Sequence, residues 1–172
     1  MKNIYLVGFM GTGKTYVGRI LASRLKRTFI EMDETIEARQ VKKIADIFAE
    51  FGEKHFRDLE HELLIELAEK QDLVVSCGGG LICHENNLKL LKSSGVMINL
   101  ESSPEKIYER IKGNTQRPLL NVPNPLEKIR ELFAERKVYY DQADLSVRSE
   151  NETPEQVADN ILEIIKSKLT KE

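Results

Sequence analysis

Short apolar runs alternate along the chain with longer segments in which apolar residues recur at helical spacing. Apolar runs of four or five residues are typical of strands buried on both faces, as in a parallel sheet covered by helices. The strand candidates are residues 4–7, 29–32, 73–76, 96–100 and 145–147. This alternation predicts an α/β fold, a five-stranded parallel sheet with helices on both faces.

Two of the segments between these runs carry apolar residues at a period near 3.6, which predicts helices with one buried face. In residues 53–70 the apolar positions are Phe56, Leu59, Leu63, Leu64 and Leu67, and residues 15–26 follow the same spacing. Three more helices are predicted from their first residues, because Ser103 and Asn124 each precede a proline and residues 153–156 form a capping box.

Residues 112–125, KGNTQRPLLNVPNP, keep neither period and contain three prolines. A long irregular segment inside a compact domain is more often a functional lid or binding loop than a connector. We therefore predict a lid at about residues 112–124, with a flexible connector as the alternative.

The length of 172 residues fits one domain, and a net charge of −2 gives no broad attraction for nucleic acid or anionic membranes. Cys77 and Cys83 lack zinc-site spacing and are typical of free thiols in a reducing compartment. No stretch approaches the roughly 20 apolar residues of a membrane span. We expect a cytoplasmic monomer with no nucleic-acid or membrane partner.

The clearest motif is GFMGTGKT at residues 8–15, which matches G-x-x-x-x-G-K-[ST] between a predicted strand and a predicted helix. In such a P-loop, backbone N–H groups surround a phosphate, the lysine lies along the β- and γ-phosphates, and the hydroxyl binds Mg²⁺. The motif therefore predicts that a nucleoside triphosphate and Mg²⁺ bind at Gly11, Thr12, Gly13, Lys14 and Thr15, with Thr15 as the metal ligand.

The acceptor of the phosphoryl group must be found elsewhere. The sequence has no Asn-Lys-x-Asp string for guanine, and the third strand runs into Gly78, Gly79 and Gly80 where a motor ATPase usually carries Asp-Glu. These features favour transfer to a small acceptor over hydrolysis. Three consecutive glycines are disfavoured by chain entropy unless something approaches the backbone closely, although a flexible turn is the simpler alternative.

Six elements occur together in order: the P-loop, Glu31 and Asp33 after the second strand, G-E-x-x-F-R-x-x-E at 52–60, GGG at 78–80, R-P-L-L at 117–120, and R-x-x-x-Y at 136–140. In this combination nearly the whole chain resembles the shikimate kinase family. The resemblance implies a P-loop fold of the nucleoside monophosphate kinase type, with one kinase domain over residues 1–172 and an acceptor-binding region at about 31–62. It also implies Mg²⁺-dependent transfer of the ATP γ-phosphoryl group to the 3-hydroxyl of shikimate in aromatic amino-acid biosynthesis.

The resemblance assigns Arg57 and Arg136 to the shikimate carboxylate, and Gly78, Gly79 and Gly80 to the pocket wall. Arg136 also falls inside the apolar stripe of its predicted helix, where a permanent charge needs an anionic partner. From the spacing alone, a structural ion pair between Arg136 and an internal carboxylate is as good an explanation as substrate binding. Arg57 lies at the edge of its stripe, and its alternative is a solvated helix arginine.

The resemblance assigns Asp33 to the ring hydroxyls and to proton acceptance, whereas the alternative is an N-cap for a helix beginning near Glu34. It places Arg117, on the predicted lid, at the transferred phosphoryl group. It places Arg110 and the loop of residues 148–154, which ends at Pro154, at the adenine. Arg110 could instead be a solvated helix arginine. Glu31 departs from the commoner aspartate of the family, which leaves its metal role open.

A kinase of another hydroxylated acid, such as gluconate, is the nearest rival function, and a silent nucleotide-binding module is a second.

Overall fold

A parallel sheet of five strands forms the centre of the computed structural model, which describes residues 2–113 and 122–169. The strands are β1 (Asn3–Val7), β2 (Thr28–Glu31), β3 (Leu73–Ser76), β4 (Gly95–Glu101) and β5 (Leu145–Arg148), in the spatial order β2-β3-β1-β4-β5. Every predicted strand is confirmed with small changes at its ends. Met32, predicted in the second strand, instead begins a helix.

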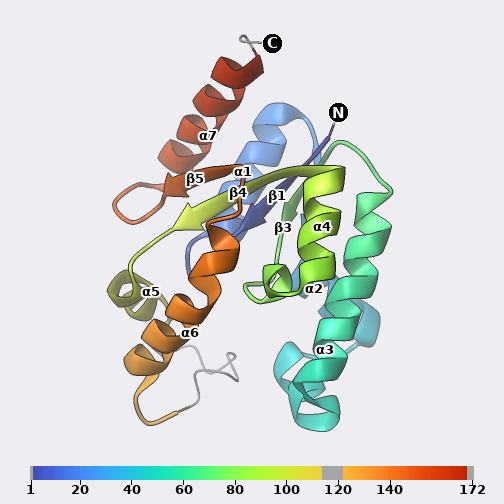
Figure 1. Ribbon diagram of the computed structural model, residues 1–172, viewed down its shortest axis with the longest axis vertical. Helices are drawn as coiled ribbons and strands as arrows, with labels where there is room; N and C mark the ends of the chain where they lie inside the picture. The colour runs from blue at the N-terminus through green and yellow to red at the C-terminus, as the bar shows by residue number, and fades with distance from the viewer. Residues whose placement is uncertain (1, 114–121, 170–172) are drawn as a thin grey trace.

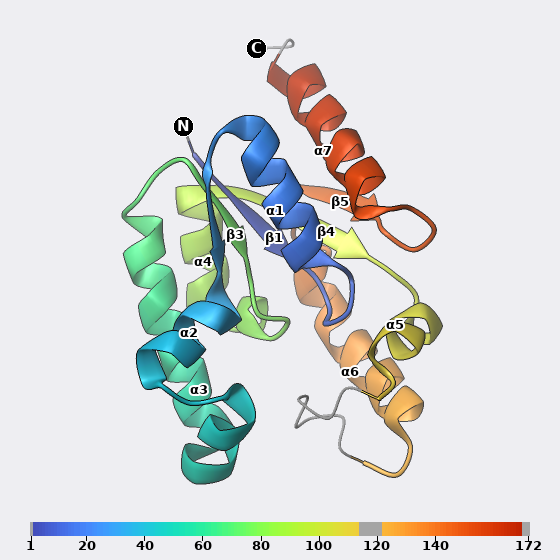
Figure 2. The ribbon, with the colours of Figure 1, turned by 180° about the vertical axis from the view of Figure 1, so that it is seen from behind.

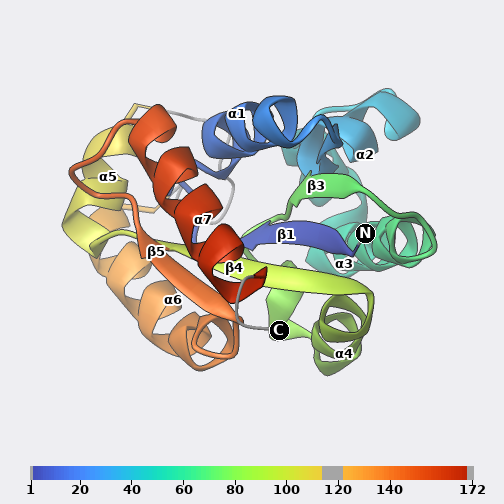
Figure 3. The same cartoon turned by 90° about the horizontal axis from the view of Figure 1, so that it is seen from above.

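Helices cover both faces of the sheet, as predicted. Figures 2 and 3 show α1 (Lys14–Leu25) and α7 (Pro154–Leu169) on one face. The other face carries α3 (Ile44–Ala68), α4 (Glu85–Ser94) and α6 (Pro125–Tyr140). Three short helices lie near the carboxyl ends of the strands, toward the lower half of Figure 1, namely α2 (Met32–Gln40), η1 (Leu81–Cys83) and α5 (Pro104–Ile111).

The two covered faces have separate apolar cores, because successive side chains of a strand point to opposite sides. In β1, Ile4 and Leu6 pack with residues of α1 and α7, whereas Tyr5 and Val7 pack with residues of α3, α4 and α6. All five residues of β1 are buried, which explains why its sequence reads as a continuous apolar run. The P-loop therefore starts from a fully buried strand in the middle of the sheet.

The predicted helix starts are also confirmed. The Ser103 side chain accepts a hydrogen bond from Lys106 N, and Pro125 is the first residue of α6. The capping box of α7 is complete, since Gln156 N donates to Thr153 Oγ1 at 3.3 Å and Thr153 N donates to Gln156 Oε1 at 2.8 Å. These caps fix where the helices begin beside the site.

Candidate active site at the carboxyl ends of the strands

The P-loop connects β1 to α1, as its sequence predicts. Gly13 is the N-cap of α1 with φ of 94°, and a Cβ added to it would meet nothing within 4 Å, so the backbone conformation alone requires glycine. The Thr12 hydroxyl donates a hydrogen bond to Phe9 O at 2.8 Å, which stabilises the conformation of the loop. The loop thus carries its backbone N–H groups to the positive end of α1, a ready site for phosphate.

Lys14 is the cation of this loop. Its side chain is buried, and Nζ donates to Gly8 O and Phe9 O at 2.9 Å each. The ammonium group is therefore held over the loop in the space where phosphate oxygens would collect.

Side-chain oxygen atoms from three elements, α1, β2 and β3, lie close together beside Lys14. Thr15 Oγ1 donates to Glu31 Oε2 at 2.6 Å, and Ser76 at the end of β3 also bonds to Glu31. Burial raises the pKa of Glu31, while these two hydroxyl groups act in the opposite direction. In the part of the chain that the structure describes, no three or more His, Cys, Asp or Glu side chains are grouped to hold a metal ion. The donor set therefore suits a Mg²⁺ ion that arrives with phosphate oxygens and water rather than one in a protein cage.

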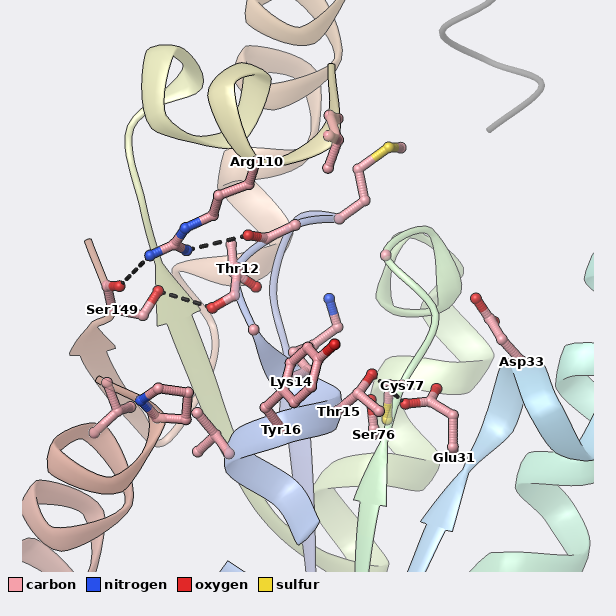
Figure 4. A pocket seen from close by; sticks show the side chains of 18 of the residues that line it. Thr12, Lys14, Thr15, Tyr16, Glu31, Asp33, Ser76, Cys77, Arg110 and Ser149 are labelled. Carbon is pink, nitrogen blue, oxygen red and sulfur yellow. Dashed lines mark hydrogen bonds between the residues drawn. The ribbon is translucent and has the colours of Figure 1, made fainter. Parts of the chain in front are cut away.

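A cavity of about 420 Å³ opens above these groups (Figure 4). Its lining includes the P-loop residues Gly11, Thr12, Gly13, Lys14 and Thr15, together with Asp33, Gly78, Gly79, Arg110 and Pro154. The structure thus brings most of the residues predicted for nucleotide and acceptor to one cavity. Arg57 and Arg136 lie behind its glycine wall and are described below.

Arg110 is exposed, as its solvated alternative requires, but its guanidinium is also hydrogen-bonded to the protein. The guanidinium donates to Gly11 O at 3.1 Å and to Ser149 O at 2.6 Å, and the Ser149 hydroxyl donates to Thr12 O at 2.9 Å (Figure 4). Ser149 lies in the loop of residues 148–154, which the resemblance places at the adenine. Arg110 and Ser149 together connect the loop after β5 to the P-loop and shape the end of the cavity where Pro154 lies.

Asp33 is the second residue of α2, so it is not the N-cap of that helix. The N-cap is Glu31, and α2 begins at Met32. The alternative role for Asp33 is therefore wrong. Asp33 faces the cavity (Figure 4), and its Oδ1 would be 3.3 Å from a Cβ added to Gly78.

Arg57 is largely buried on α3, with 13% of its side chain exposed, so the solvated alternative is wrong as well. It pairs with Glu53 at 2.9 Å and with Glu60 at 2.5 Å, and only 1% of the Glu60 side chain is exposed. Burial raises the pKa of Glu60 to about 7 despite the neighbouring Arg57.

The sequence analysis gave Glu60 no role, although the signal was present. Glu60 lies four residues after Phe56 and three before Leu63, both buried, so it occupies the apolar stripe of α3. The same reasoning that singled out Arg136 would have found it. Glu60 Oε1 is buried and has no hydrogen-bond partner among the residues that the structure describes. It lies so close to Gly78 that a Cβ there would overlap it.

Arg136 lies on the inward face of α6 with 9% exposure, as predicted. Its guanidinium carbon lies 5.7 Å from the centre of the Phe9 ring. Within residues 2–113 and 122–169 no carboxylate forms an ion pair with Arg136. The alternative role of Arg136, a structural ion pair with an internal carboxylate, is therefore not observed among these residues. A buried guanidinium without such a partner is suited to an anionic ligand.

The loop of Gly78, Gly79 and Gly80, here called the glycine loop, touches each of these charged groups. A Cβ on Gly78 would collide with Glu60, one on Gly80 would lie 2.7 Å from three Arg57 atoms, and one on Gly79 would lie 3.7 Å from Arg136 Nη1. Close approach therefore requires the glycines, and the flexible-turn alternative is wrong. What approaches them are the protein's own side chains, in addition to any ligand. Together with Asp33, Arg57, Glu60 and Arg136, the glycine loop is called the acceptor pocket below.

Arg117 and most of the predicted lid, residues 114–121, lie outside the described residues. Within residues 2–113 and 122–169, no helix is long and apolar enough to cross a lipid bilayer.

A P-loop on the central strand with a separate, arginine-lined pocket beside it defines a P-loop kinase of small molecules. Comparison with known proteins narrows this class. The family model described as shikimate kinase matches residues 10–166, and the chain belongs to the shikimate kinase family. The shikimate kinase of Thermodesulfovibrio yellowstonii is 45% identical over 94% of each chain, and that of Pelotomaculum thermopropionicum is 46% identical over 96% of each.

Solved structures agree with this assignment. The shikimate kinase of Acinetobacter baumannii in complex with shikimate superposes with a TM-score of 0.95 at 38% identity, covering 98% of this chain and 94% of that one. A gluconokinase of Sinorhizobium meliloti reaches a TM-score of 0.57 at 18% identity over 92% of this chain and 87% of that one. The second match shows the shared fold alone.

Proposed function

We propose that the protein transfers the γ-phosphoryl group of ATP to the 3-hydroxyl of shikimate, giving shikimate 3-phosphate and ADP in aromatic amino-acid biosynthesis. One observation carries this proposal. At Gly79, an added Cβ would lie 3.3 Å from Met10 N of the P-loop and 3.7 Å from Arg136 Nη1. The phosphate-binding loop and the arginine pocket therefore adjoin, as direct transfer between two bound substrates requires.

On the nucleotide side, the backbone of Gly11, Thr12 and Gly13 surrounds the phosphates, and Lys14 neutralises charge on the transferred phosphoryl group. Arg110 and Pro154 form the adenine end, which the position of both residues in the cavity lining supports. Because Arg110 is already held by Gly11 O and Ser149 O, this end is ordered before the nucleotide binds.

Thr15 is the protein ligand for Mg²⁺, and its short bond to Glu31 supports a site for a hard cation at this point. Glu31 accepts the hydrogen bond of Thr15 and so orients this hydroxyl. Thr15 would hold the Mg²⁺ ion, which would offset the negative charge of the phosphate groups. The protein's own contribution is to hold the Thr15 hydroxyl at the mouth of the P-loop.

On the acceptor side, Arg57 and Arg136 bind the carboxylate of shikimate, since planar guanidinium groups pair well with both of its oxygens. Asp33 bonds the ring hydroxyls and accepts the proton of the attacking 3-hydroxyl. Gly78, Gly79 and Gly80 allow the ring to lie against the backbone. The Acinetobacter baumannii enzyme, which superposes closely on this chain and was solved in complex with shikimate, supports this choice of acceptor.

Arg117 would add positive charge at the transferred group when both substrates are bound, and this role rests on the family resemblance alone. We further propose that the enzyme acts as a cytoplasmic monomer.

The test is a coupled assay of ADP release with ATP and Mg²⁺ against shikimate, quinate and gluconate. We expect kcat/KM for shikimate to be at least a hundredfold higher than for quinate or gluconate. A preference for gluconate would overturn the acceptor assignment while leaving the kinase class intact. No acceptor-dependent ADP release with any acid would overturn the kinase function itself.

A further inference from the structure

One buried tyrosine touches the glycine loop without lining the nucleotide cavity. Tyr140 is the last residue of α6 and is 3% exposed. Its hydroxyl donates to Gly79 O at 2.5 Å, across 61 positions of sequence. Burial raises the pKa of Tyr140 above its ordinary value, so the hydroxyl is a neutral donor at neutral pH.

The same face of α6 also contacts the P-loop. Phe133, two turns before Tyr140, packs on Phe9 with ring centres 5.9 Å apart, and Arg136, one turn before it, lies over the same ring. Side chains three and four apart share one helix face, so these three residues act from a single surface. This surface therefore contacts both loops that meet at Gly79.

We propose that Tyr140 is a positioning residue that fixes the glycine loop relative to Arg136, so that the acceptor binds with its hydroxyl next to the P-loop. The inference rests on the proposed function, because the acceptor is the molecule that uses this spacing. Gly79 has no side chain through which other residues could hold it, and a bond to its carbonyl controls its position directly. A displacement of a few tenths of an ångström at Gly79 would move the acceptor relative to the γ-phosphoryl group.

The rest of the glycine loop has its own supports. Leu81 N donates to Gly78 O and Cys83 N donates to Gly80 O, both at 3.1 Å. Asn87 Nδ2 donates to Leu81 O at 2.9 Å and holds the following turn to α4. These bonds would keep the loop folded when the Tyr140 bond is lost, so the main expected consequence is a change of position and not of fold.

The test compares Tyr140→Phe with Tyr5→Phe. Both changes remove one buried hydroxyl, but that of Tyr5 bonds Ser94 Oγ at 2.9 Å at the opposite end of β1. For Tyr140→Phe we expect the KM for shikimate to rise about fivefold or more, with a lower kcat, while the Kd for ATP changes less than about twofold. Amides of Leu81 and Cys83 should exchange hydrogen faster than in the wild type.

For Tyr5→Phe we expect a similar loss of thermal stability with unchanged KM and kcat. Equal stability losses and wild-type kinetics in both variants would show that the Tyr140 hydroxyl only stabilises the fold, and would overturn the inference. Equal rises in the KM for shikimate and the Kd for ATP would overturn it too. Wild-type turnover with shikimate tests the proposed function separately, because it does not depend on either variant.

Discussion

The P-loop and the acceptor pocket meet at Gly79, yet they are made of different groups. Eight consecutive residues form the P-loop, which offers backbone N–H groups and one lysine for the proposed phosphate contacts. The acceptor pocket draws Asp33 from α2, Arg57 and Glu60 from α3, Arg136 from α6 and its glycines from the end of β3. The residues of the P-loop are neighbours in sequence, whereas those of the acceptor pocket come together only in the folded chain.

This difference has an electrostatic consequence. A helix N-terminus presents fixed partial charges that cost little to hold, whereas buried carboxylates and guanidinium groups must be balanced against one another. In the acceptor pocket Glu60 is buried beside Arg57 and near Asp33, and its raised pKa records that cost. We therefore expect substitutions in the P-loop to affect mainly phosphoryl transfer, and substitutions in the acceptor pocket to affect acceptor binding, stability and pH dependence.

The largest expected effect is on the P-loop side. Lys14→Ala should lower kcat about 10³-fold, since it removes the charge that meets the developing phosphoryl oxygens. The exposed Lys89, paired with Glu85 on α4, provides a matched control, and Lys89→Ala should leave turnover unchanged. Steady-state ADP release and circular dichroism measure activity and fold. A folded Lys14→Ala enzyme with near-normal turnover would contradict the mechanism.

Asp33→Asn is the next largest effect and tests whether chemistry extends into the acceptor pocket. The amide keeps the shape but cannot accept the proton, so kcat should fall about 10²-fold with a smaller change in the KM for shikimate. Glu34→Gln, one residue along α2, changes an exposed carboxylate paired with Arg19 and should have no effect. If the Asp33→Asn enzyme keeps its turnover, the hydroxyl needs no base, which a loose transition state allows.

Glu60 should give the acceptor pocket a pH-dependent stability. Its pKa rises to about 7 in the folded protein, from the ordinary value of 4.5. Between pH 4.5 and about pH 7, Glu60 keeps a proton in the folded protein that it has released in the unfolded chain. The free energy of unfolding therefore falls as the pH rises through this range. The full decrease would be at most about 3–4 kcal/mol, because the pKa differs by roughly 2.5 units and one unit corresponds to about 1.4 kcal/mol.

Glu60→Gln should remove this slope, measured by urea unfolding at pH 5, 6, 7 and 8 without ligand. Glu53→Gln is the matched control, since Glu53 also pairs with Arg57 but its side chain is 50% exposed. The control should keep the slope of the wild type. Parallel pH profiles for the wild type and Glu60→Gln would mean that the buried carboxylate is charged across the range.

The same contrast explains what the sequence could predict. The P-loop and the capping box of α7 are contiguous, and each was confirmed because local backbone geometry alone decides it. The helix α4 was missed, since its ten residues begin with Glu-Asn-Asn and its apolar face is short. The first half of α3 was missed because Gly52, with φ of 83°, interrupts the helix and ended the periodic pattern there.

In the acceptor pocket, the sequence identified Arg136 by its place in an apolar stripe but could not say what faces it. Whether Arg57 was solvated or buried depended on the close approach of Gly80, which belongs to a loop about 20 residues further along the chain. The bond from Tyr140 to Gly79 spans 61 positions and left no local trace. Side-chain pairing between separate elements is fixed by packing, and a single sequence does not encode it at any one position.

Arg136→Ala gives the smallest of these effects, and it best separates the role of the acceptor pocket from that of the P-loop. Its guanidinium has no carboxylate partner in the described part of the chain, so removal should cost little stability. Binding of shikimate should weaken by about 2 kcal/mol, or roughly 30-fold in Kd, with the affinity for ATP unchanged. Arg130→Ala, on the same helix, removes an exposed arginine paired with Glu105 and should change neither affinity. Calorimetry that finds equal losses for both ligands, or a large fall in the melting temperature without ligand, would mean that Arg136 supports the P-loop through Phe9 and that the two halves are not separable.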